Sequence, residues 1–224
     1  MEDLQQYPRP SVAVDIAVLT VVDHKLCVLI QDRNVKPLGR ALPGRFLRER
    51  ELVKDCMTVA LREKANLDPG TGEPQLLRVF DEPERDNRGW TLSLGHYLVL
   101  PPSRVARTTA SLVEVSRATG LLFDHDRIVS EAASAMRLRY ELAPDPDHLL
   151  TEPFTLAELR MLHEAVLGEP LQRDTFRRRM IPNLRPYLEH GVQASRVDRG
   201  RPARLWLPQA VDPLEAERLR LPRA

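Results

Sequence analysis

Residues 154–207 restrict the fold most, because they contain two short helical patterns followed by two extended runs with an arginine-rich turn between them. The first pattern begins at Thr155, and Glu158 follows three residues later, which is the spacing of a capping box at a helix start. Apolar residues then recur at helical spacing until Gly168 and Pro170 end the segment. One face of this helix is therefore expected to lie in a core.

The second helical pattern, roughly residues 172–181, surrounds the apolar pair Phe176 and Met180 with arginines. The apolar pair can pack inward while the guanidinium groups point outward, where they fit phosphate oxygens and the guanine edge in the major groove. Segment 154–207 holds ten arginines, no lysine and six acidic residues, whereas the whole chain has a formal net charge of +1. This outline is typical of a DNA-binding winged helix, and the alternative is a solvated arginine face on an ordinary helical subdomain.

The predicted DNA-binding residues follow from this arrangement. We expect side chains of the second helix at or near base edges and phosphates, and those of the turn on a wing near the minor groove or backbone. A single short helix reads few bases, so a homodimer on a roughly palindromic operator of double-stranded DNA is expected. The residues are Arg173, Thr175, Arg177 and Arg178 on the helix, and Arg199, Arg201 and Arg204 on the wing.

Length and composition fit two small domains in a chain of 224 residues. No apolar run is long enough to span a bilayer, and the N-terminal MEDLQQ lacks a signal-peptide pattern, so we expect a cytoplasmic location and no membrane partner. The two cysteines, Cys27 and Cys56, lack metal-ligand spacing. No nucleophile motif such as G-x-S-x-G is present.

The N-terminal part alternates strand and helix patterns. Residues 11–33 predict a hairpin of two largely buried strands with Asp23 and His24 at the turn. Proline and aspartate between two helical patterns make residues 143–151 the best linker candidate. We therefore predict two domains, residues 1–148 and 149–224. The further predicted elements are a helix at 52–66, strands at 75–81 and 90–100, and a helix at 125–140.

The hairpin, the turn Leu42-Pro43-Gly44-Arg45-Phe46 and the helix after it resemble the Nudix fold and its signature loop and helix. That signature reads Gly, five residues, Glu, seven residues, Arg-Glu, an apolar residue, any residue, Glu-Glu, any residue, Gly. Aligning Glu51 with the first glutamate shows that most of the acidic cluster is gone. Arg45 then falls on the first glycine, Val59 and Ala60 on Arg-Glu, Glu63 and Lys64 on the glutamate pair, and Asn66 on the last glycine.

The lost carboxylates matter because Nudix hydrolysis relies on several of them converging on divalent metal ions. Glu63 survives, as a metal ligand or as an exposed helix carboxylate. At Ala60 an expected ligand is missing, and the ammonium group of Lys64 repels cations. We therefore expect a domain that has kept the pocket and lost the chemistry, with no catalytic residue, no metal and no cofactor. The alternative is an active Nudix hydrolase of ADP-ribose-like pyrophosphates.

The combination of a degenerate Nudix-like domain with a winged helix resembles the Nudix-related transcriptional regulators of bacteria, the NrtR family, over nearly the whole chain. The resemblance implies an α+β fold: a Nudix-like mixed sheet with flanking helices, followed by a C-terminal winged helix-turn-helix domain. Its most specific blocks are the two at the C-terminus. The blocks are RPSVAVDIAVLTV, ALPGRF, DEPERDNRGWTLSLGHYLVL, FDHDRI, EPFTLAELRMLHEAVLGEPLQRDTFRRRM and GRPARLW.

The resemblance also implies a function: a repressor of NAD-related or sugar-related operons whose N-terminal pocket senses ADP-ribose or a related nucleotide. Ligand binding would reorient the paired winged helices and change their DNA affinity. A third reading is a sensor module that acts through a protein partner with an acidic surface. The ligand-binding residues expected on this basis are Arg45, Glu63, Arg85, Arg88 and Trp90.

Each of these residues has a plainer alternative. Arg85 and Arg88 would clamp phosphates, or they pair with nearby acidic residues. Trp90 would stack on a base or ribose, or it lies in the core at a strand start. Arg45 would add a phosphate contact or fill the pocket. The acidic residues available to the two loop arginines are Glu82, Glu84 and Asp86.

Overall fold

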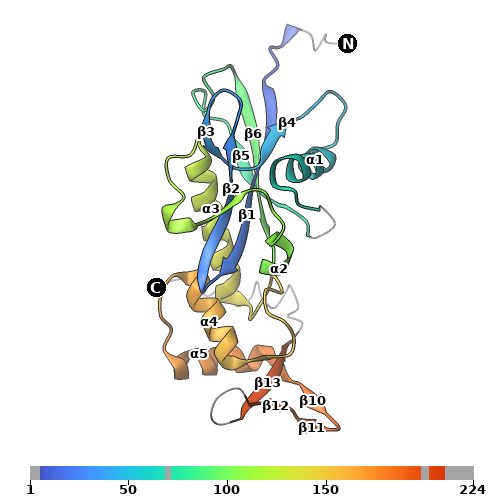
Figure 1. Ribbon diagram of the computed structural model, residues 1–224, viewed down its shortest axis with the longest axis vertical. Coiled ribbons are helices and arrows are strands. Elements are labelled where there is room, and N and C mark those ends of the chain that lie inside the picture. The colour runs from blue at the N-terminus through green and yellow to red at the C-terminus, as the bar shows by residue number, and fades with distance from the viewer. Residues whose placement is uncertain (1–5, 69–71, 198–201, 210–224) are drawn as a thin grey trace. The chain divides into compact units, whose positions relative to one another are not determined.

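The computed structural model describes residues 6–68, 72–197 and 202–209 (Figure 1). The chain divides into two compact units. The first comprises Met1–Thr20 and Cys27–Ala133, and the second comprises Val21–Leu26 and Ser134–Ala224. The division falls inside one helix, α3 (His125–Leu142), so this helix contributes to both units. The domain boundary expected after residue 148 stays a prediction.

The first unit is built on a mixed sheet of the order β3-β2-β1-β6-β5, with β4 paired to β1 and β7 paired to β2. Strands β1 and β6 run parallel, whereas β4, β5 and β7 pair antiparallel with their neighbours. The strands are β1 (Ser11–Val22), β2 (Lys25–Arg33), β3 (Gly39–Ala41), β4 (Gly44–Phe46), β5 (Gln75–Phe80), β6 (Thr91–Val99) and β7 (Ser111–Glu114).

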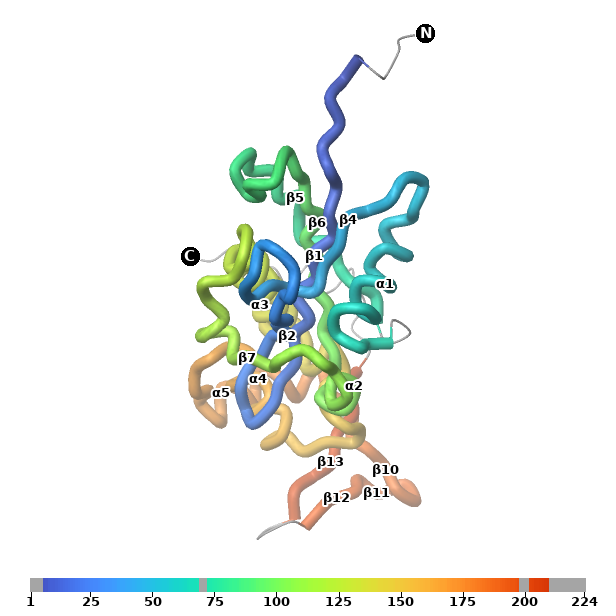
Figure 2. Tube along the Cα trace, turned by 45° about the horizontal axis from the view of Figure 1, so that its top comes forward, coloured from blue at the N-terminus to red at the C-terminus, as the bar shows by residue number. Residues whose placement is uncertain are grey.

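The predicted hairpin is confirmed, because Asp23 and His24 connect β1 to β2 with φ of 49° and 58°. Both residues occupy the left-handed region that a two-residue hairpin turn of the favoured hand requires. Strand β1 is buried along most of its length, because side chains on both of its faces are covered. Helix α1 (Val53–Ala65) and the first half of α3 lie on opposite sides of the sheet (Figures 1 and 2).

Helix α1 forms where the apolar spacing predicts it, and it ends at Asn66, which adopts φ of 50° as a left-handed cap. Its buried face carries Cys56, Ala60 and Leu61, which share a core cluster with Val14 of β1. The short elements between the strands escape sequence reasoning, because they have too few residues to show a period. They are β3, β4, β7, the helix α2 (Pro102–Val105) and the 3-10 turn Val115–Arg117.

Besides the second half of α3, the described part of the second unit contains α4 (Leu156–Leu167), α5 (Arg173–Met180), a four-stranded sheet and the two-stranded sheet of β10 and β11. The predicted capping box is confirmed: the Glu158 amide donates to Thr155 Oγ1 at 3.2 Å, and the Thr155 amide donates to Glu158 Oε2 at 2.7 Å. Strand β13 pairs with β8, β9 and β12. The strands are β8 (Phe154–Thr155), β9 (Leu184–Pro186), β10 (Leu188–Glu189), β11 (Val192–Gln193), β12 (Ser195–Arg196) and β13 (Ala203–Pro208), and Ile181–Asn183 forms a 3-10 turn.

The second half of α3 supplies part of the core of this unit. The Tyr140 ring meets the edge of His163 at 5.2 Å between centroids, and His163 meets Phe176 of α5 at 5.1 Å. Burial lowers the pKa of His163 to about 4, and Nε2 of this neutral imidazole lies 2.5 Å from the Pro144 carbonyl oxygen. Tyr140 donates its hydroxyl hydrogen to Asp145 at 3.0 Å. The aromatic series therefore ties α3, α4 and α5 together.

Within the described ranges, no helix combines the length and the apolar character needed to cross a bilayer.

Candidate functional site

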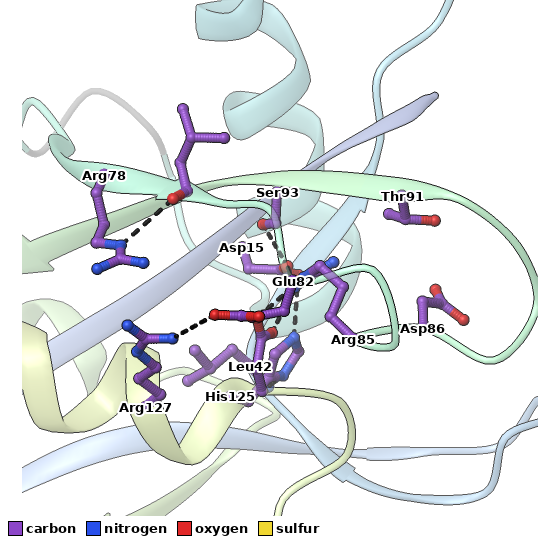
Figure 3. A network of polar contacts seen from close by, with 12 residues as sticks. Asp15, Leu42, Arg78, Glu82, Arg85, Asp86, Thr91, Ser93, His125 and Arg127 are labelled. Atoms are coloured by element: carbon purple, nitrogen blue, oxygen red, sulfur yellow. Dashed lines mark hydrogen bonds and ion pairs between the residues drawn. The ribbon is translucent and has the colours of Figure 1, made fainter. Parts of the chain in front are cut away.

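A buried polar network surrounds Asp15 of β1, and Figure 3 shows Ser93, Arg85 and His125 directed toward it. Ser93 Oγ donates to the carboxylate at 2.6 Å, and Arg85 Nη2 lies 3.4 Å from it. The Leu42 amide donates to His125 Nδ1 at 2.9 Å, which places the imidazole proton on Nε2. Nε2 faces Asp15 at 3.3 Å, an electrostatic contact because its alignment is poor for a hydrogen bond.

The charge state of Asp15 follows from this surrounding. Burial acts to raise the pKa of the carboxyl group. His125, Ser93 and Arg85 outweigh the burial and hold the pKa at about 2. Asp15 is therefore an anion at neutral pH, and it fixes the start of α3 and the strand β6 to β1.

Gly44 in the predicted turn motif is required by the same carboxylate. A Cβ atom at this position would lie 2.2 Å from Asp15 Oδ1 and 2.6 Å from the Val14 carbonyl oxygen. Strand β4 can therefore approach β1 only with glycine here. The glycine that matters for packing is thus Gly44, one residue before the position that the Nudix signature assigns to glycine.

Arg85, for which the sequence left a phosphate clamp and pairing with nearby acidic residues open, lies in this network. Its guanidinium forms a two-bond pair with Asp124, with Nε–Oδ2 at 3.0 Å and Nη2–Oδ1 at 2.6 Å. Its side chain is 2% exposed. Arg85 thus holds the loop of residues 81–90 against the start of α3, and its guanidinium faces two carboxylates.

Arg88 and Trp90 remain accessible from solvent. The side chain of Arg88 is 41% exposed and forms a two-bond pair with Asp86, at 2.9 and 2.6 Å. Its guanidinium carbon also lies 5.4 Å from the ring centroid of Phe46 and 5.1 Å from that of Phe123. Trp90 is 52% exposed, so the alternative that placed it in the core is wrong.

Arg45 and Glu63 belong to a second group of side chains, near α1. Arg45 Nη1 lies 2.5 Å from Glu51 Oε1, and this hydrogen bond raises the pKa of Arg45. The charge of Glu63 adds to the same shift, so Glu63 is an electrostatic neighbour of Arg45. Because Arg45 and Phe46 are consecutive on β4, their side chains point to opposite sides of the strand.

The family's metal cluster does not fit the residues that stand at its positions. Ala60 is fully buried and offers no ligand, and Lys64 adds a positive charge. Glu63 is exposed on the helix. In the part of the chain that the structure describes, no group of three or more His, Cys, Asp or Glu side chains is arranged to hold a metal ion.

Helix α5 presents an arginine face to solvent, because Phe176 and Met180 point inward and are 5% and 2% exposed. The helix start is capped by Gln172, whose Oε1 accepts from the Thr175 amide at 2.6 Å. Arg179 differs from its neighbours, since it donates to the Glu141 carbonyl at the end of α3. The predicted residues Arg173, Thr175, Arg177 and Arg178 are exposed on this helix, as are Asp174 and Arg179.

The wing is described only in part. Arg204 on β13 is exposed, as expected for a residue that contacts DNA. Arg199 and Arg201 lie outside the described residues. A further exposed arginine that sequence reasoning did not single out is Arg185, on β9 beside the buried Leu184. The alternation of a buried and an exposed residue was the available signal, but three residues are too few to show it clearly.

Comparisons with known proteins show which regulators the chain resembles. Residues 146–207 match the NrtR DNA-binding winged helix domain. The ADPR responsive transcriptional repressor NtrR of Acinetobacter baylyi is 29% identical over 217 residues, which cover 89% of this chain and 82% of the relative. The crystal structure of Shewanella oneidensis NrtR complexed with a 27mer DNA is 28% identical, with a TM-score of 0.67 over 88% of this chain and 93% of that chain.

Residues 146–207 thus form an NrtR winged helix domain, and the chain as a whole is similar to NrtR regulators. The NUDIX domain of Shewanella oneidensis NrtR complexed with ADP ribose shares its fold with the first unit, at a TM-score of 0.52 and 23% identity, over 60% of this chain and 93% of that chain. The predicted resemblance to the NrtR regulators is therefore confirmed. So is the predicted α+β fold, a Nudix-like sheet followed by a winged helix-turn-helix domain.

Proposed function

We propose that this protein is a transcriptional repressor that binds operator DNA with its second unit and responds to ADP-ribose bound by its first. The observation that carries the proposal is the exposed arginine face of α5, inside a segment that matches the NrtR DNA-binding winged helix domain. The Acinetobacter relative is an ADPR responsive repressor, and the Shewanella relative was crystallised with DNA. Control of NAD metabolism genes is part of the proposal.

The DNA-binding surface divides by role. Arg173, Arg177 and Arg178 lie on one short helix and present guanidinium forks suited to guanine edges and phosphates. Arg204 and the wing add contacts to the backbone, which position the protein without reading sequence. The second unit functions as a homodimer in this proposal, because one such helix reads too few bases for a specific operator. A cytoplasmic location is also part of the proposal.

The effector pocket uses the exposed side of the loop 81–90. Arg88 supplies a guanidinium for phosphate and Trp90 an exposed ring for stacking. Arg45 and Glu63 lie near α1, where the family signature has its metal-binding carboxylates. Because Ala60 and Lys64 stand in place of carboxylates, the bound pyrophosphate would not be hydrolysed.

Helix α3 is the element through which a bound effector would reach the DNA-binding surface. At its start, Asp124 and His125 belong to the network that holds Arg85. Near its end, Glu141 accepts a hydrogen bond from Arg179 of α5. A ligand that moves the loop 81–90 would act on α3 through the Arg85–Asp124 pair. A resulting shift of α3 would then change the position of α5.

A mobility-shift titration with DNA from upstream of the protein's own gene, with and without ADP-ribose, tests the proposal. We expect a specific shift that ADP-ribose alters, and a steep loss of affinity with salt because phosphates dominate the contacts. A specific shift that ignores ADP-ribose would leave the regulator and remove this effector. No specific shift at modest salt would remove DNA binding. Release of ribose phosphate from ADP-ribose with magnesium at ordinary enzyme rates would contradict the lack of hydrolysis.

A further inference from the structure

Arg33 at the end of β2 shares an aromatic platform with Arg88. Its guanidinium carbon lies 5.6 Å from the ring centroid of Phe123, and that of Arg88 lies 5.1 Å from the same centroid. Both distances are within the range of cation–π attraction. Three segments that are distant in sequence thus bring two guanidinium groups to one ring.

The two cations are not equally neutralised. Arg88 is paired with Asp86, whereas the hydrogen bonds of the Arg33 side chain go to the main-chain carbonyls of Pro37 at 2.9 Å and Lys36 at 3.4 Å. Over the described ranges, no carboxylate forms an ion pair with Arg33. Burial and then the positive charge of Arg88 lower the pKa of Arg33, so each guanidinium lies within the field of the other. The charges of Asp15 and Asp86 act on Arg33 in the opposite direction, although neither carboxylate forms an ion pair with it. An anion between the two guanidinium groups would relieve their mutual repulsion.

The platform itself is held in an unfavourable backbone conformation. Phe123 has φ of 62°, and a bulky residue in this left-handed region is rare and strained. The next two residues fix it, because Asp124 is bound by Arg85 and the His125 ring lies 5.2 Å from the Phe123 ring. The buried network thus positions the ring before any ligand arrives, which lowers the ordering cost of binding.

We propose that Arg33 and Arg88 form a clamp for the diphosphate of the effector, with Phe123 as the platform that holds both guanidinium groups. This rests on the proposed effector function and adds to it a residue and the ligand group that the residue takes. A guanidinium fork binds a phosphate through two parallel hydrogen bonds. Two forks that meet at one ring suit two linked phosphates, whereas a single carboxylate would engage only one of them.

Calorimetric titration of the full chain with ADP-ribose, inorganic pyrophosphate and adenosine tests the clamp. The variants are Arg33→Gln, Arg33→Lys and a matched control, Arg104→Gln, which removes an exposed arginine of α2 in the same unit. Arg33→Gln loses one charge-assisted contact, so it should bind ADP-ribose and pyrophosphate about 10- to 100-fold more weakly than wild type. Arg33→Lys keeps the charge but not the fork, so its affinity for both ligands should lie between those of wild type and Arg33→Gln. Arg104→Gln should stay within about twofold of wild type, as a surface change with no contact at the site.

The outcomes separate the clamp from the effector. If wild type binds ADP-ribose and Arg33→Gln matches Arg104→Gln, the clamp is wrong and the proposed effector stands. If wild type binds pyrophosphate in an Arg33-dependent manner but not ADP-ribose, the clamp stands and the effector is another diphosphate. If neither ligand binds, both are wrong. Should Arg33→Gln unfold, Arg33→Lys decides: unchanged affinity for pyrophosphate overturns the clamp, and a reduced one supports it.

Discussion

Arg85 in the first unit and Arg177 in the second unit are arginines in opposite surroundings. Arg85 is buried, and its guanidinium is bound to Asp124 and faces Asp15. Arg177 is exposed on α5, among other exposed arginines. The first ties a loop to a helix, and the second is proposed to offer its charge to DNA. The type of residue is the same, so exposure and the nearby carboxylates decide the role.

The largest expected effect is on stability, when Arg85 is replaced. Arg85→Met leaves Asp124 without its two-bond partner and removes a positive charge beside Asp15. Breaking a buried pair by removing one partner costs about 3–5 kcal/mol, because it leaves an uncompensated charge. Urea unfolding of the first-unit transition measures this cost, with Arg177→Met as the exposed control, expected within about 0.5 kcal/mol of wild type. Equal losses in the two variants would contradict the contrast between them.

The pH dependence of the unfolding free energy sharpens the comparison, because the residue with the shifted pKa differs between the two units. In the second unit, His163 has a folded-state pKa of about 4, below its ordinary 6.5. The unfolded chain therefore takes up the proton first, so this contribution is complete above pH 6.5 and is lost as pH falls toward 4. The loss amounts to about 3 kcal/mol. Unfolding of wild type and His163→Gln between pH 7 and 4 measures it, and the loss should be absent in the variant.

In the first unit the sensitive range is more acidic. Asp15 has a folded-state pKa of about 2 against its ordinary 3.8, so its contribution is complete above that ordinary value and is lost as pH falls through 2. The contribution amounts to about 2 kcal/mol. The difference in unfolding free energy between wild type and Asp15→Asn should therefore be constant from pH 7 to 5 and shrink toward pH 2. A difference that shrinks near pH 6 instead would contradict the assignment to Asp15.

Sequence reasoning found the features that depend on residues close together in the chain. The capping box of Thr155 and Glu158 and the turn of Asp23 and His24 are local hydrogen-bonding and backbone preferences, and the structure has both. The helix at α1 followed from spacing alone. Its end at Asn66 agrees with the prediction within one residue.

Partners distant in the chain could not be found this way. Arg85 pairs with Asp124, 39 residues away, and only the fold brings the two together. Arg33 was overlooked for the same reason, since the ring it shares with Arg88 comes from Phe123. The sequence also did not show that α3 belongs to both units, because a continuous helical pattern does not indicate that its two halves pack in different units.

Replacing an exposed arginine of α5 should change the free energy of unfolding least, and it should still clearly weaken DNA binding. Arg177→Gln removes one exposed guanidinium from the arginine face and should weaken operator binding about 10- to 100-fold, the range for one good base contact. If Arg177 reads a base, competition by unrelated DNA should rise in the variant while the salt slope changes little. If it only contacts phosphate, binding to all sequences should fall together and the salt slope should drop by about one.

Arg179→Gln is the matched comparison, because Arg179 is directed to the Glu141 carbonyl and its loss should act through the packing of α5. The two variants could instead lose operator affinity equally, with the unfolding transition unchanged in each. That outcome would place Arg179 on the DNA surface as well. The helix would then have no distinction between an arginine that reads DNA and one that anchors the helix.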